Sequence, residues 1–380
     1  MKSVISDSVL FLVALLPLTK ASPTHWSRGY TEPIYNDSIP SVVFNCGYDV
    51  PNWVINVGFG TPNQPARLLI DSTFDNTFVA GVMCHSEFCE DQKGPLYNAG
   101  KSSTSIRQHQ RKTFDLGDGE VVTGDIYKDN FNFGDFTYDN FIFGKAFDVQ
   151  GFPSSSDFAG VFGLSLPDTT NNKNKKRSIS RPFANSRSQK PGTRKRSSSY
   201  DQCSFSAGID YSLISGEIFW LNLPTCEYGN SPFYKTDLTC VTIDGVLDLK
   251  FKDTVAEFDT TVKNIEVPHN DLQKIHQGLH ASFDSSINDY AFKCCDAKDL
   301  EISFAEYTVS IPASSWTREL DNTGELCVAK ISESKTTIAP VNRWRLGTDF
   351  MLNLYTIFDT EQTGIALAKF GEKNARIFSK

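Results

Sequence analysis

One pattern occurs twice in this chain: a short apolar run that ends in an aspartate and continues with hydroxyl residues. The first copy is Leu68–Phe74, which contains Asp71, and the second is Val255–Val262, which contains Asp259. The two acids are 259 − 71 = 188 residues apart, about the length of one domain. Strands that each deliver a carboxylate into a loop predict two similar lobes that face each other across a cleft.

Five further segments lie in a fixed order around these acids: Val57–Pro62 before Asp71, Gly117–Gly124 and Asp157–Leu164 between the two acids, and Trp344–Phe350 and Ile357–Thr360 after Asp259. With these residues the chain resembles the pepsin-like aspartic proteases over about residues 48–370. The resemblance implies a mostly β, bilobal fold with a cleft. It implies an N-terminal lobe at residues 48–168 and a C-terminal lobe at 201–370.

The resemblance also assigns Asp71 and Asp259 as the catalytic pair. Two carboxylates within hydrogen-bond range share one proton, because both cannot ionise cheaply. The ionised acid takes a proton from a water, and the other donates to the carbonyl of the substrate. This chemistry needs no metal and no cofactor. The implied partner is a peptide or protein in the cleft of a monomer.

The residues beside both acids depart from the family pattern. Ser72 and Thr260 keep the hydroxyl that ties the two lobes together. Thr73 and Thr261 stand where the family has glycine, and β-branched residues tolerate a positive φ poorly. Where the family next has a hydroxyl residue that bonds the carboxylate, the chain has an apolar side chain, Phe74 or Val262. We therefore expect each carboxylate to lose one charge-assisted hydrogen bond, worth roughly 1.5–3 kcal/mol.

The expected flap is the turn around Leu116, Gly117, Asp118 and Gly119. Leu116 stands where the family has a tyrosine that covers the substrate, and Phe78 where a tryptophan commonly supports it.

Three hypotheses about function follow. The chain is a non-catalytic homologue that binds peptides, which the changed loops favour, or an active acid endopeptidase, which the retained acids favour. In the third, it is a structural secreted protein that uses only the fold.

The first 21 residues are typical of a secretory signal peptide, with Lys2 before an apolar run at Val9–Leu16. That run is too short to span a membrane, and the sequence predicts no membrane span elsewhere. We expect a secreted or lysosomal protein. Residues 22–47 leave little room for an inhibitory prosegment, and Asn36 fits the N-glycosylation pattern.

Nine cysteines in an exported chain predict disulfides, and the odd count leaves at least one thiol without an intramolecular partner. Cys84 and Cys89 enclose a short loop that is similar to one closed by a family disulfide. Cys327 matches another with Cys294 or Cys295, of which we assign Cys295. Four cysteines have no assignable partner: Cys46, Cys203, Cys226 and Cys240.

Residues 169–200 hold ten bases and no acid, and they predict a disordered surface insertion. The rest of the chain then has 37 − 10 = 27 bases against 45 acids, a net charge of −18. Two readings of the insertion stay open: a solvated loop, or a segment that convertases cleave at its basic runs. Nucleic-acid binding is not expected of an exported chain. The three histidines near residues 269–280 are assigned to a solvated helix face, and residues 371–380 to a loose tail.

Overall fold

The computed structural model describes most of the chain, with several gaps. The described residues are 11–15, 41–46, 51–92, 94–117, 119–154, 156–165, 202–206, 208–222, 224, 234–320, 323–334, 342–359, 364–371 and 373–380. Asn36, Asp118, Cys226 and the basic insertion at 169–200 lie outside them.

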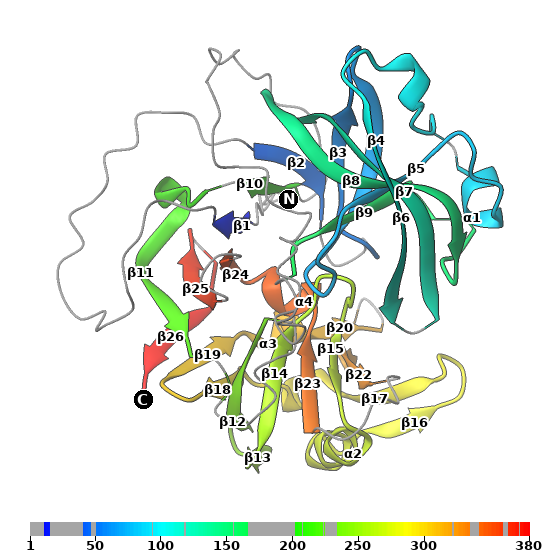
Figure 1. Ribbon diagram of the computed structural model, residues 1–380. Helices are drawn as coiled ribbons and strands as arrows, with labels where there is room; N and C mark the ends of the chain where they lie inside the picture. Colours follow the sequence, from blue (N-terminus) through cyan, green and yellow to red (C-terminus); the bar gives the residue numbers. More distant parts are fainter. Residues whose placement is uncertain are drawn as a thin grey trace, which may run out of the picture.

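A seven-stranded sheet forms the N-terminal lobe, drawn in blue to green in the upper part of Figure 1. Its strand order is β3-β4-β9-β5-β8-β7-β6. The bounds are β3 (Val54–Phe59), β4 (Gln64–Asp71), β5 (Phe78–Ala80), β6 (Ile106–Gly117), β7 (Glu120–Phe133), β8 (Phe136–Gln150) and β9 (Gly160–Gly163). The long pair β6–β7 is the hairpin expected as the flap.

The C-terminal lobe contains a nine-stranded sheet whose main path is β22-β15-β23-β14-β12-β18-β19-β26, with β13 paired to β12. Its bounds are β12 (Lys235–Ile243), β13 (Leu247–Lys250), β14 (Thr254–Phe258), β15 (Ile265–Val267), β18 (Leu300–Phe304), β19 (Tyr307–Ile311), β22 (Ile331–Glu333), β23 (Asn342–Leu346) and β26 (Arg376–Ser379). A four-stranded sheet lies in the same lobe: β16 (Ser282–Asp284), β17 (Asp289–Lys293), β21 (Leu326–Ala329) and β20 (Thr317–Glu319).

A third, six-stranded sheet has the order β11-β25-β24-β1-β10-β2. Its strands are β1 (Phe11–Leu15), β2 (Ser41–Asn45), β10 (Gln202–Ser206), β11 (Ile214–Leu221), β24 (Leu354–Asp359) and β25 (Gly364–Phe370). Strand β1 lies between β10 and β24 and is parallel to both. Because β1 falls inside the expected signal peptide, cleavage after residue 21 would remove the strand that joins these two neighbours. The signal peptide stays a prediction.

The described helices are short: α1 (Glu87–Glu90), α2 (His269–Gly278), α3 (Ala313–Trp316) and α4 (Thr348–Met351). Helix α2 begins after Pro268 and carries two of the three clustered histidines. His269 contacts Glu333, and the ring of His276 stacks on Tyr290. None of the described helices is both long and apolar enough to cross a membrane.

Aromatic side chains fill the core of the N-terminal lobe. The sequence predicts that the alternating Phe residues on either side of the turn at Gly134 form a face that packs on a core, and this is confirmed. Phe131, Phe133, Phe141 and Phe143 are all at most 2% exposed. Tightly packed rings of this kind make the strands of the N-terminal lobe rigid.

Three disulfides are present among the described cysteines: Cys46–Cys203, Cys84–Cys89 and Cys294–Cys327. The second was expected, and the first pairs two cysteines for which the sequence offered no partner. Our assignment of Cys295 to Cys327 is wrong. Cys294 makes that bond, because it is the partly buried one of the two and packs against the core, whereas Cys295 is exposed and its thiol is free. Cys240 is the other free cysteine described.

The expectation of a loose C-terminal tail is also wrong. Residues Arg376–Ser379 form β26, which pairs antiparallel with β19 at the edge of the large sheet. Arg376 makes an ion pair with Asp299 at 3.0 Å. The bases beyond Phe370 are therefore part of the folded lobe.

Candidate active site

Both aspartates stand where a buried strand ends. Asp71 is the last residue of β4, after three buried apolar residues, and Asp259 directly follows β14. Asp71 is 4% exposed and Asp259 is fully buried. The two loops meet between the lobes, so the two acids that the sequence singled out lie close enough for the charge of one to act on the other.

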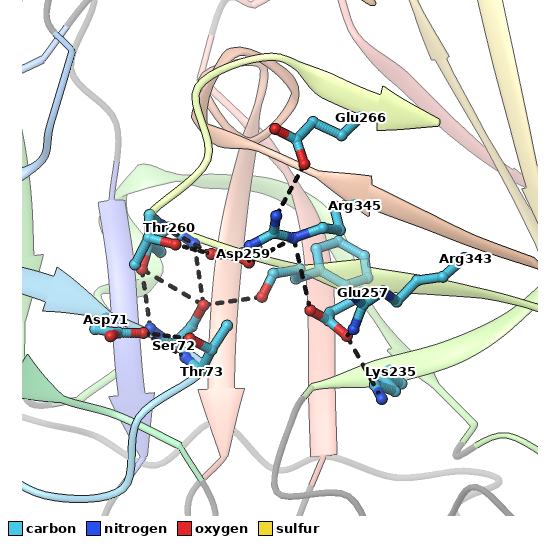
Figure 2. Close-up of polar contacts among 12 residues, drawn as sticks. Asp71, Ser72, Thr73, Lys235, Glu257, Asp259, Thr260, Glu266, Arg343 and Arg345 are labelled. Atoms are coloured by element: carbon cyan, nitrogen blue, oxygen red, sulfur yellow. Dashed lines mark hydrogen bonds and ion pairs between the residues drawn. The ribbon is translucent and has the colours of Figure 1, made fainter. Parts of the chain in front are cut away.

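Reciprocal hydrogen bonds join the two loops (Figure 2). The Ser72 N–H donates to Thr260 Oγ1 at 2.9 Å, and the Thr260 N–H donates to Ser72 Oγ at 3.0 Å. Each hydroxyl also donates to a carbonyl of the opposite lobe, Ser72 to Phe258 at 2.9 Å and Thr260 to Ile70 at 2.7 Å. All of these groups are buried, so the bonds tie the lobes together at the position of the acids.

Breaking this tie has a measurable cost. We expect Ser72→Ala to lower the free energy of unfolding by roughly 1–3 kcal/mol, because the Thr260 N–H and the Phe258 carbonyl are left buried without the serine partner. Denaturant unfolding measures the change. Ser285, which is exposed, provides the matched control, and Ser285→Ala should change stability by less than about 0.5 kcal/mol. Equal stabilities of the two variants would contradict the assignment.

Our expectation that each carboxylate loses a hydrogen-bond donor is wrong. Thr73 donates to Asp71 Oδ1 through both its backbone N–H and its hydroxyl, each at 2.7 Å. Thr261 does the same to Asp259 Oδ1, at 2.9 and 2.6 Å. Neither threonine is among the residues with positive φ. The hydroxyl has therefore moved by one residue along the loop, which leaves the next position free to be apolar.

That apolar position packs into the lobe. Phe74 is buried and makes edge contacts with Phe78 and with Phe114 of the flap strand β6. Beside it, the Lys112 ammonium of β6 donates to Asn76 Oδ1 at 3.0 Å. At the flap turn, Gly117 and Gly119 have the positive φ that favours glycine. Leu116 packs against the same core.

Arg345, a basic side chain that the sequence analysis did not assign to the site, contacts Asp259. Arg345 of β23 donates to Asp259 Oδ2 through Nε at 2.9 Å and through Nη2 at 2.5 Å (Figure 2). Its Nη1 donates to Glu266 Oε2 at 2.8 Å. Burial by itself lowers the pKa of Arg345, but Asp259, Glu266 and Glu257 outweigh it and raise the pKa above its ordinary value. The guanidinium is therefore a permanent charge.

This contact uses up the acceptor capacity of Asp259. A carboxylate has about four lone-pair sites, and Asp259 accepts four hydrogen bonds, two at Oδ1 from Thr261 and two at Oδ2 from Arg345. Asp71 differs, because its hydrogen bonds come from Thr73, both to Oδ1, and from the backbone of Phe74, and not from a guanidinium. The two acids are therefore chemically unequal.

The environment of Asp71 favours its neutral form. Burial, followed by the charge of Asp259, raises the pKa of Asp71 to about 6, although the hydrogen bonds from Thr73 and the backbone of Phe74 act against this. Asp71 is therefore mostly protonated well below pH 6 and mostly ionised well above it.

No group of three or more His, Cys, Asp or Glu side chains suited to a metal ion occurs among the described residues.

The arrangement is two lobes joined through paired Asp-Ser and Asp-Thr loops, with a hairpin from the N-terminal lobe beside the first loop. This arrangement defines a pepsin-like aspartic protease fold.

The chain belongs to the eukaryotic aspartyl protease family, whose model matches residues 52–370. It is 24% identical to a probable aspartic-type endopeptidase of Arthroderma otae over 80% of this chain and 79% of that protein. It is 23% identical to pepsin A of Gallus gallus, over 81% and 82% of the two chains. It is also similar to pregnancy-associated glycoprotein 1 of Sus scrofa, with 25% identity over 83% and 80%.

Proposed function

We propose that this protein is a secreted member of the aspartic protease family that binds peptides without hydrolysing them. The contact of Arg345 with Asp259 Oδ2 carries the proposal. Hydrolysis needs a water that both carboxylates hold and that one of them deprotonates. Asp259 has no lone pair left to accept that hydrogen bond, and the guanidinium beside it cannot take up a proton.

A peptide ligand follows from the family, whose members act on extended chains that lie between the lobes. The hydrogen bonds between the lobes and the packing of the flap strand against Phe74 support a binding site that is already formed before the peptide binds. Export follows from the predicted signal peptide and agrees with the three disulfides.

A second candidate, an active acid endopeptidase, is favoured by one observation. Thr73 and Thr261 restore hydroxyl donors to both carboxylates, so the loops themselves do not disable the pair. In this case Arg345 would have to leave Asp259 when substrate binds.

Peptide hydrolysis separates the two candidates. Purified protein is incubated with a mixed peptide library at pH 3 to 6, beside Asp71→Asn and Asp259→Asn variants, and the products are identified by mass spectrometry. We expect the wild type to produce no more cleavage than the two variants. Binding is measured on the same material, by recovery of library peptides that remain with the protein after size exclusion.

Cleavage by the wild type that is lost in both variants would overturn the proposal in favour of the endopeptidase. Absence of both cleavage and peptide recovery would overturn the binding part, and would leave the structural role as the remaining hypothesis.

A further inference from the structure

Four charged side chains lie in one row across four neighbouring strands of the C-terminal lobe. Cross-strand register pairs Lys235 of β12 with Glu257 of β14, Glu257 with Arg345 of β23, and Arg345 with Glu266 of β15. The signs therefore alternate along the row, and Figure 2 shows the four side chains with Asp259 beside them.

Register alone predicts a different partner for Arg345. Glu257 is directly opposite Arg345, whereas Asp259 lies two residues further along the chain. Nevertheless the Nε of Arg345 is 3.9 Å from Glu257 Oε1 and only 2.9 Å from Asp259 Oδ2. Arg345 thus lies closer to Asp259 than to Glu257, its cross-strand partner.

Two other bases account for this preference. Arg343 donates to Glu257 Oε2 at 3.0 Å, and the Lys235 ammonium lies 3.5 Å from the same oxygen. Both cations compensate the charge of Glu257, so Arg345 gains less by turning to it. On its other side, Arg345 is held by Glu266, whose bond to Nη1 leaves Nε and Nη2 directed at Asp259.

We infer that Lys235, Arg343 and Glu266 are positioning residues that direct the Arg345 guanidinium onto Asp259. Lys235 and Arg343 compensate Glu257, the alternative partner. Glu266 accepts from Nη1 and so leaves Nε and Nη2 for Asp259. The inference rests on the proposed function for its biological meaning, but its geometry can be tested separately. In this inference Glu257, a buried acid that no step of the family chemistry uses, is the competing partner of Arg345.

The cost of the row supports a specific role. Glu257 is 2% exposed, and desolvation raises its pKa in spite of Arg343 and its other basic neighbours. Buried ion networks are often no more stabilising than apolar side chains of the same size. A row of charges on this face is therefore better explained by the orientation that it imposes than by stability.

The test measures the position of Arg345 through its effect on Asp71, independently of hydrolysis. The carboxyl of Asp71 is titrated by carbon NMR in the wild type and in the Lys235→Met/Arg343→Met variant. With Glu257 uncompensated, Arg345 should turn to it and leave the charge of Asp259 unscreened. The pKa of Asp71 should then rise by roughly one unit.

A double-mutant cycle separates this movement from the direct loss of two charges. The same two substitutions are made in an Arg345→Met background, where no guanidinium can move, and should shift the pKa of Asp71 much less. Arg343→Met alone, with Lys235 kept, serves if the larger variant does not fold. The exposed Arg376 provides the control Arg376→Met, which should cause no shift.

Equal shifts in the two backgrounds would overturn the inference, because they would show that Arg345 stays on Asp259 without its neighbours. This result is distinct from failure of the proposed function, which is detected as cleavage by the wild type or as absence of peptide recovery.

Discussion

Arg345→Met should gain peptide hydrolysis at acid pH. The substitution frees both lone pairs of Asp259 Oδ2 while the hydrogen bonds from Thr73 and Thr261 stay in place. Asp71, whose pKa of about 6 in the wild type should rise when the guanidinium is removed, then supplies the proton at pH 4 to 5. General acid–base catalysis contributes about 10²- to 10⁴-fold, and we expect a gain of that order over the wild type, measured on peptides from the library.

Three variants control this experiment. Arg345→Lys keeps a cation beside Asp259 and should stay inactive, and Arg345→Met combined with Asp71→Asn should lose the gained activity. Arg376→Met removes an arginine remote from the site and should behave as the wild type. Near-UV circular dichroism confirms that each variant is folded, because removal of one partner of a buried ion pair costs about 3–5 kcal/mol. A folded Arg345→Met protein without activity would show that the loops, and not the guanidinium, silence the pair.

The stability of the protein should fall as the pH rises through the range in which Asp71 ionises. The pKa of Asp71 is about 6 in the folded protein and 3.8 in its ordinary state. Between these values the folded state binds more protons than the unfolded state, so the free energy of unfolding decreases with increasing pH. A difference of about two pKa units corresponds to roughly 3 kcal/mol, which is lost by pH 7.

Asp71→Asn should remove this loss. The amide cannot ionise, and its oxygen can still accept the bonds from Thr73. Urea unfolding of the wild type and of the variant should give a difference that is small at pH 3.5 and grows to roughly 3 kcal/mol in favour of the variant at pH 7. Asp139, which is exposed, gives the matched control Asp139→Asn. A constant difference across this range would contradict the raised pKa.

The resemblance implied the fold, and several of its strands were predictable because their signals are local. The run that ends in Asp71 is the buried end of β4, and the run before Asp259 is the buried strand β14. The alternating phenylalanines around Gly134 formed the expected buried face. Each of these patterns depends on the periodicity of one strand.

The site was harder to predict because it depends on contacts between strands. We considered Thr73 only for its backbone conformation, because the family has glycine there. We did not expect its hydroxyl to donate to the carboxylate of Asp71, two residues earlier. Arg345 was visible as a base within a family segment, but its contact with Asp259 depends on the parallel register of β23 with β14. The contact joins residues 86 positions apart, and no local pattern encodes it.

A crystal structure of the wild type grown near pH 4.5 tests the central claim most directly. The account predicts that Nε and Nη2 of Arg345 lie within hydrogen-bond distance of Asp259 Oδ2 and that no water bridges Asp71 and Asp259. A water held by both carboxylates, with Arg345 turned towards Glu257 or Glu266, would contradict it and would restore the site to an ordinary acid protease.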